Sequence, residues 1–168
     1  MSLFKEVSGD EILNYLRRQI LKNWKKWEVP PAWTEGIKKS LKELGRQRKY
    51  KICASLSGSD YPEWLYDLCW SKGHIGVPTK YKGLCLIVEI EWKGDYDILY
   101  DFQKLTAGVA DLRLIVICYG KCNRGMDWVR KVIIKCKACC PQGMLYKYII
   151  IAIPEDINDE IVKEEWCI

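Results

Sequence analysis

Residues 84–92 constrain the fold of this chain more than any other segment. The run opens with five apolar residues, which is typical of a strand buried on both faces in the middle of a sheet. Glu89 and Glu91 follow at alternate positions, and side chains at i and i+2 of a strand point to the same face. Two like charges at the edge of an apolar element repel each other and are poorly solvated. We therefore expect a cation between them, and Mg²⁺ prefers such hard oxygen ligands.

A second aromatic-rich segment, residues 64–70, is predicted to be another strand. It holds a further acid, Asp67, near its middle. If the two segments pair, Asp67, Glu89 and Glu91 converge on one cation. The sequence thus predicts a metal site for Mg²⁺ or Mn²⁺.

Length and composition indicate one soluble domain. The chain has 168 residues, of which 49% are hydrophobic and 29% are charged, as in ordinary globular proteins. No apolar run approaches the roughly 18 residues that a membrane span needs, and the first residues lack the pattern of a signal peptide. We expect a cytoplasmic protein with no membrane partner. A net charge of +5 permits a polyanionic partner without requiring one.

Apolar periodicity and capping signals predict alternating helices and strands. The first helix is expected to end before Pro30-Pro31, and Thr34 is expected to cap the second. The element order is α-α-β-β-β-α-β-α-β-α, which favours an α/β sandwich whose mixed sheet is first antiparallel and then parallel through crossovers. The expected helices span residues 9–27, 35–44, 97–107, 126–139 and 155–166, and the expected strands 51–56, 64–70, 84–92, 112–119 and 146–153.

Three segments, residues 63–67, 89–92 and 101–105, carry a likeness to a known family. An acid in the second strand, two acids ending the third and a helix directly after it resemble the PD-(D/E)XK nuclease superfamily. The resemblance covers roughly residues 34–119 and implies a restriction-endonuclease-like αβββαβ core, with a mixed central sheet flanked by helices. Residues 1–33 would form an extra N-terminal helical extension, and residues 120–168 an additional helix, strand and C-terminal helix of the same single nuclease-like domain.

The resemblance also implies roles for individual residues. Asp67 and Glu89 would bind the metal, and Glu91 occupies the position that the superfamily usually fills with lysine. A carboxylate there can bind a second metal ion or accept the proton of the attacking water. Lys104, on the following helix, is expected to supply the missing positive charge. Glu91-Trp92-Lys93 is a rival, literal E-x-K register, which we disfavour because Lys93 abuts a predicted turn.

The activity implied by this resemblance is that of a metal-dependent endonuclease that hydrolyses phosphodiester bonds, with DNA preferred over RNA as the substrate. The alternative is a non-catalytic nucleic-acid-binding or assembly protein that retains the nuclease fold. A nucleic-acid backbone needs basic surface beside the site. We expect that surface from the residues that lead into the first strand, namely Lys38, Lys39, Lys42, Arg46, Arg48 and Lys49.

Nine cysteines and one histidine lie outside this pattern. Cys118, Cys122 and the cluster at residues 136–140 leave three interpretations open, which are buried thiols, a disulfide involving Cys122 and a zinc site. Because Cys118 falls inside an apolar strand, buried thiols are favoured. His74 lies in a glycine-rich loop and is expected on the surface.

A tryptophan cluster bears on assembly. Trp24, Trp27 and Trp33 surround Pro30-Pro31, where three indoles could form an exposed apolar patch. We therefore expect a symmetric homodimer that uses the N-terminal helical region.

Overall fold

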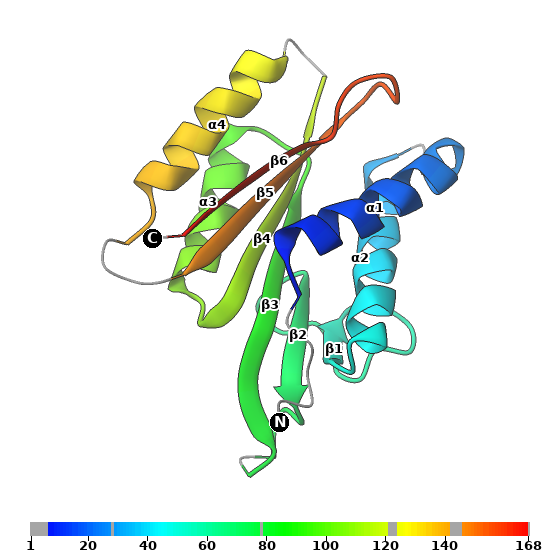
Figure 1. The fold of residues 1–168 in the computed structure, drawn as a ribbon, viewed down its shortest axis with the longest axis vertical. Coiled ribbons are helices and arrows are strands. Elements are labelled where there is room, and N and C mark those ends of the chain that lie inside the picture. The colour runs from blue at the N-terminus through cyan, green and yellow to red at the C-terminus, as the bar shows by residue number, and fades with distance from the viewer. Residues whose placement is uncertain (1–6, 28, 78, 121–123, 142–145, 168) are drawn as a thin grey trace. The chain divides into compact units, whose positions relative to one another are not determined.

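The computed structural model describes residues 7–27, 29–77, 79–120, 124–141 and 146–167 (Figure 1). Two compact units divide the chain, Met1–Ile87 and Val88–Ile168. The described residues form an α/β protein with four α-helices, one short 3-10 helix and six strands. The strands form a mixed sheet in chain order, β1-β2-β3 in the first unit and β3-β4-β5-β6 in the second, because β3 runs through the division. Within these ranges, no helix is long and apolar enough to span a membrane.

The first helix, α1 (Gly9–Asn23), begins at the residue predicted for its start. Ser8 is the N-cap, and its hydroxyl accepts a hydrogen bond from the backbone N–H of Glu11 at 3.2 Å. A short 3-10 helix, η1 (Trp24–Lys26), follows, so the regular α-helix ends before Trp27. The apolar stripe of α1 is buried at Ile12, Leu16 and Ile20.

The second helix, α2 (Pro30–Gln47), begins earlier than predicted. Proline is tolerated at the first helical position because the N–H that it lacks would have no partner there. The prediction that Thr34 caps this helix was wrong. Thr34 lies inside α2, and its hydroxyl donates to the Pro30 carbonyl oxygen at 3.1 Å.

β1 (Lys51–Ala54) and β2 (Leu68–Gly73) pair antiparallel, which confirms the predicted start of the sheet. Trp70 of β2 is fully buried and stacks on Tyr50, with ring centroids 5.5 Å apart. The indole also packs against Gly45 of α2, where an added Cβ atom would lie 2.6 Å from the Trp70 ring nitrogen. Glycine at position 45 therefore lets α2 approach β2 closely.

The strand predicted at residues 64–70 is wrong in its first half. β2 begins at Leu68, so Asp67 precedes the strand instead of lying in its middle. Trp64 and Leu65 are exposed rather than buried. Ion pairs to α2 hold this segment in an irregular conformation that does not extend the ladder.

β3 (Tyr81–Glu91) contains the predicted strand and starts three residues earlier than expected. Residues 84–90 are all buried, as their apolar run indicates. After a short turn, α3 (Asp95–Ala107) begins with Asp95 and Asp97 in its first turn. Carboxylates at this end are favourable because they complement the helix dipole.

β4 (Ala110–Tyr119), α4 (Met126–Ala138) and β5 (Lys147–Pro154) form a strand–helix–strand unit. β4 and β5 pair in parallel, which confirms the predicted crossover. The α4 helix is tied to the start of α3 through Asp95. The carboxylate of Asp95 accepts from the Trp128 indole at 2.7 Å and from the Lys135 ammonium at 2.8 Å.

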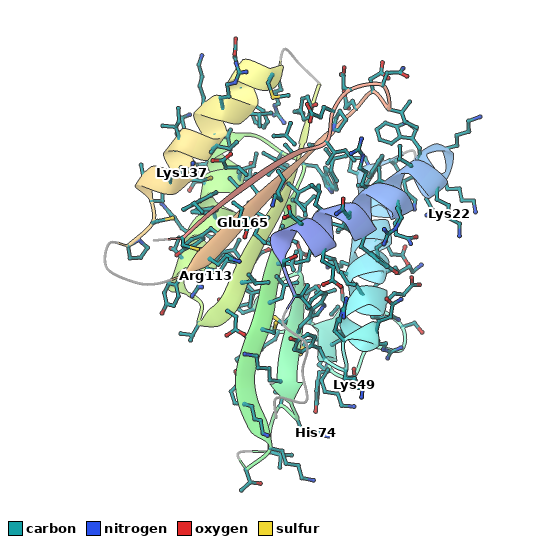
Figure 2. The ribbon with its side chains drawn as sticks, in the orientation of Figure 1. Lys22, Lys49, His74, Arg113, Lys137 and Glu165 are labelled. Atoms are coloured by element: carbon teal, nitrogen blue, oxygen red, sulfur yellow. The ribbon has the colours of Figure 1, made fainter. Side chains whose placement is uncertain are left out.

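The predicted C-terminal helix over residues 155–166 was wrong. Val162–Cys167 form the strand β6, which pairs antiparallel with β5. Trp166 stacks on Tyr148 of the neighbouring strand, with ring centroids 5.6 Å apart. Glu165, labelled in Figure 2, pairs with Lys147 across the two strands at 3.0 Å. These cross-strand contacts favour the extended conformation, and β6 covers the edge that β5 would otherwise expose.

A buried arginine organises the turn between α3 and β4. Arg113, which is labelled in Figure 2, is only 1% exposed and donates to the carbonyl oxygens of Leu105 at 3.0 Å, Ala110 at 2.8 Å and Gly108. Its guanidinium also lies over the Tyr146 ring, 3.6 Å from the centroid. A buried charge is tolerated when its donors are satisfied in this way. Arg113 thereby fixes the C-terminal end of α3.

Candidate active site

Glu89 and Lys104 form a buried ion pair in the second unit. Glu89 lies near the end of β3 and is 3% exposed. The Lys104 ammonium, on α3, lies 2.7 Å from its Oε1 atom. Burying a carboxylate is costly unless a cation compensates it. Lys104 therefore neutralises Glu89 at the position where the sequence predicted a relocated lysine.

Asp101 is a second acid at the same ammonium. Its Oδ1 atom lies 3.2 Å from the Lys104 nitrogen, and the two residues are three positions apart on α3. Burial lowers the pKa of Lys104, but the hydrogen bond and charge of Glu89, followed by Asp101, outweigh burial and raise that pKa. Lys104 therefore remains a cation across the physiological range. Sequence analysis missed Asp101, although its three-residue spacing from Lys104 was a usable signal.

Glu91 has a different role from Glu89 in the structure. It is half-buried, and its Oε1 atom accepts from the backbone N–H groups of Trp92 and Lys93, both at 2.7 Å. The carboxylate thus fixes the turn that follows β3. Lys93 is exposed and lies beyond the end of the strand, as expected from its place beside the turn. Lys104 is the lysine for which the structure shows a contact with Glu89.

Asp67 belongs to an ion-pair cluster in the first unit. The ammonium of Lys38, on α2, lies 2.9 Å from Asp67 Oδ1 and 2.8 Å from Glu63 Oε2. The Ser55 hydroxyl donates to the same Glu63 oxygen at 2.8 Å. Burial lowers the pKa of Lys38, but hydrogen bonds to Glu63 and Asp67 outweigh burial and raise it. Sequence analysis gave no role to Glu63 or Ser55.

Lys38 does not belong to the exposed basic surface on which we expected it. Its side chain is 8% exposed, and two carboxylates neutralise its charge. Burial also raises the pKa of Glu63, but the hydrogen bonds from Lys38 and Ser55 outweigh burial and lower it. Lys38 is therefore a structural cation that holds the segment before β2 on α2.

The other basic residues divide into two groups. Lys39 is exposed and pairs with Glu35 at 2.7 Å, and Arg48 pairs with Glu11 of α1. Lys42 and Arg46 instead donate to carbonyl oxygens of the loop after β1, and Lys49 is exposed at the end of α2 (Figure 2). Arg46 also interacts electrostatically with Asp60, whereas among the described residues Lys42 contacts a carbonyl oxygen and has no carboxylate partner.

The predicted convergence of three acids stays a prediction. Asp67 lies in the first unit, and Glu89 and Glu91 lie in the second. Across the described ranges, no group of three or more His, Cys, Asp or Glu side chains is placed to hold a metal ion. Glu89 and Asp101 nevertheless present two carboxylates to one cationic position. That donor set fits Mg²⁺, which proteins commonly hold through one or two carboxylates together with water and substrate phosphate.

The cysteines with described positions are thiols. Cys118, Cys136, Cys139 and Cys140 are free, while Cys122 lies outside the described residues, so a disulfide or zinc site that includes it remains a prediction. Burial raises the pKa of Cys136 to about 12, which makes this thiol unreactive.

His74 is exposed (Figure 2), as expected, and its Nδ1 atom lies 3.1 Å from the Tyr61 hydroxyl.

The tryptophan cluster of the N-terminal region is packed rather than exposed. Trp33 makes edge-to-face contacts with Trp24 and Trp27, each with ring centroids 5.1 Å apart. All three are half-buried, and Trp27 lies against Gly36 of α2. The expectation of an exposed indole patch was therefore wrong. The homodimer stays a prediction, without this support.

Comparison with models of known protein families, with curated proteins and with solved structures found no match. The geometry thus defines an α/β protein with two acid–lysine centres, one in each unit. The likeness to the PD-(D/E)XK superfamily rests on the sequence pattern alone.

Proposed function

We propose that the protein is a metal-dependent nuclease that hydrolyses phosphodiester bonds of nucleic acid, with DNA as the first substrate to test. The observation that supports this most is the contact between Lys104 and buried Glu89, reinforced by Asp101. The resemblance to the PD-(D/E)XK superfamily implies an acid at the end of a central strand with a lysine nearby, and a lysine ammonium and a metal ion can both stabilise the charge of a scissile phosphate.

The residues of this centre have complementary roles in the proposal. Glu89 and Asp101 would hold Mg²⁺ or Mn²⁺, which when bound lowers the pKa of water and neutralises phosphate charge. Lys104 donates hydrogen bonds to the scissile phosphate and stabilises the negative charge that develops there. Glu91, beside the end of β3, accepts the proton of the attacking water after it releases its backbone hydrogen bonds.

The first unit would contribute to the same function. Asp67, held by Lys38, is the further acid that the family resemblance assigns to metal binding. Lys42, Arg46 and Lys49 supply positive charge for the nucleic-acid backbone. A homodimer would allow two such centres to cut opposite strands.

A non-catalytic nucleic-acid-binding or assembly protein is the second candidate. It is favoured by one observation, that Glu89 and Glu91 already have partners in the structure, an ammonium and two backbone N–H groups respectively. In that case Lys104 would replace the cation permanently, and the centre would stabilise the fold.

A plasmid-nicking assay separates the two candidates. The nuclease converts supercoiled DNA to open-circular or linear forms with Mg²⁺ or Mn²⁺ and not with EDTA. A protein that binds the plasmid but leaves it intact with either metal is the second candidate. Calorimetric titration with Mn²⁺ adds an independent readout, because Glu89→Gln should abolish a binding event that the unchanged protein shows.

A further inference from the structure

The connection between β1 and β2 carries an exposed aromatic side chain that the proposed catalytic centre does not use. Trp64 is 65% exposed and the adjacent Leu65 is 59% exposed. The other seven tryptophans of the chain are buried or half-buried. Leaving a large apolar ring in water forgoes the stabilisation that burial would give. A ligand that covers the exposed Trp64 ring would therefore gain the free energy of burying it.

The structure holds this tryptophan on a fixed segment. Lys38 of α2 binds Glu63 on one side of Trp64 and Asp67 on the other, at 2.8 and 2.9 Å. Between them, Tyr66 is buried with 4% exposure. Both ends of the segment are thus attached to the first unit, and Trp64 is presented outward. A segment that is already held in place loses less entropy when it binds a ligand.

A serine-rich depression, with Asp60 as its charged lining residue, precedes Trp64 in the same connection. Residues 54–57 and 59–62 line a hollow of about 430 Å³. Lys42 donates to the Ser57 carbonyl oxygen at 2.7 Å, and Arg46 donates to that of Gly58. Asp60, which lines the hollow, pairs with Lys51 at 3.1 Å and also interacts with the charge of Arg46, whereas Lys42 has no carboxylate partner among the described residues. Lys42, Arg46 and Lys51 thus outnumber Asp60 beside the hollow, and the remaining positive charge suits a phosphate group.

The hollow and the indole lie within reach of one nucleotide. Pro62 lines the hollow, and two residues of extended chain separate Pro62 and Trp64 by at most about 7 Å. An aromatic platform beside a positively charged groove is how proteins bind single-stranded nucleic acid without sequence preference. A protein partner would gain little from two cations that a polyanion neutralises directly.

We propose that this connection is a subsite for a single strand of nucleic acid. Trp64 stacks on an unpaired base, and Lys42 and Arg46 bind a neighbouring phosphate. The choice of nucleic acid as the ligand rests on the proposed function. The subsite adds which part of that substrate this surface would recognise. A substrate that occupies this subsite must contain an unpaired base.

Fluorescence anisotropy in EDTA tests the subsite without any cleavage. The probes are a fluorescein-labelled oligodeoxythymidylate and an abasic deoxyribose-phosphate strand of equal length and charge. Trp64→Ala should weaken binding of the oligodeoxythymidylate about tenfold or more, because base stacking contributes on that scale, and should leave binding of the abasic strand unchanged. Trp64→Phe should restore most of the affinity.

Two further variants complete the test. Leu65→Ala, at the adjacent exposed apolar residue, should change neither affinity, whereas Lys42→Met with Arg46→Met should weaken both. Equal losses for Trp64→Ala and Leu65→Ala, a Trp64→Ala loss on the abasic strand, or no binding of either probe would overturn the inference. Absence of plasmid cleavage with Mg²⁺ and Mn²⁺ would instead contradict the proposed catalysis, and it leaves this binding result unaffected.

Discussion

The ammonium of Lys104 on α3 lies 2.7 Å from the Oε1 atom of Glu89, a carboxylate that is almost completely buried near the end of β3. Helix and strand are joined by a turn of three residues, 92–94, so the pair closes a short loop of the chain. The turn is further fixed by Glu91, which accepts two backbone hydrogen bonds, and by Arg124, which donates to the Lys93 carbonyl oxygen at 2.8 Å. The fixed turn between β3 and α3 therefore positions the two residues on which the proposed catalysis depends.

Removing the lysine of this pair should destabilise the protein. Lys104→Met leaves the Glu89 carboxylate buried without its cation, which should lower the free energy of unfolding by about 3 kcal/mol. The double variant Glu89→Gln with Lys104→Met removes the buried charge as well and should recover most of that loss. Urea denaturation of the single and double variants measures both values. Equal losses in the two would show that the buried charge of Glu89 does not need Lys104.

Lys38 should matter for stability in a way that its neighbour does not. Lys38→Met leaves Asp67 and Glu63 without their shared cation and should cost about 2 kcal/mol, less than a fully buried pair because both acids are partly solvated. Lys39→Met is the matched control, because Lys39 is 58% exposed and a surface change of this kind alters stability by less than about 0.5 kcal/mol. Urea denaturation at neutral pH compares them. Similar small effects would contradict the structural role of Lys38.

Acid should weaken the same cluster through Glu63. Its folded-state pKa lies below the ordinary value of 4.5, because hydrogen bonds from Lys38 and Ser55 outweigh the opposite effect of burial. Its contribution to stability is therefore present above pH 4.5 and is lost as the pH falls through the lower folded-state pKa. Glu63→Gln should reduce the decline in unfolding free energy across this range, and Ser55→Ala should have an intermediate effect. A pH profile identical to that of the unchanged protein would refute the assignment.

Cysteine reactivity should follow burial. Cys167 is exposed, whereas burial raises the pKa of Cys136 to about 12. In the folded protein, a thiol-specific disulfide reagent at mildly alkaline pH should label Cys167 and leave Cys136 unmodified until a denaturant is added. Peptide mass spectrometry identifies the labelled positions. Rapid modification of Cys136 in the native state would show that the end of α4 opens readily.

The sequence predicted the central elements well because their patterns are local and strong. The apolar run of β3 favours a buried strand, and the apolar stripe of α3 favours a helix with one buried side. The parallel pairing of β4 with β5 follows from the helix between them. Lys104 lies 2.7 Å from Glu89 because only a short turn separates β3 from α3, while its role as the lysine of an active site stays a prediction.

The failures have a common physical cause, which is contact with residues distant in the sequence. Residues 64–67 have the composition of a strand, yet Lys38 holds this segment to α2 instead. The C-terminal segment has helical spacing, yet Trp166 and Glu165 find partners on β5 only in an extended conformation. No local pattern indicates such tertiary contacts, and the buried state of Lys38 could not be distinguished from that of its exposed neighbours.

The most direct test of the account is cleavage of supercoiled plasmid by Lys104→Ala and Lys93→Ala, compared with the unchanged protein at equal concentrations in Mg²⁺. Circular dichroism first confirms that each variant is folded under the assay conditions. The unchanged protein should nick the plasmid, Lys104→Ala should lose at least about a hundredfold in rate because it lacks the cation that stabilises the transition state, and Lys93→Ala should lose little. No metal-dependent nicking by the unchanged protein, or a greater loss in Lys93→Ala than in Lys104→Ala, would contradict the account.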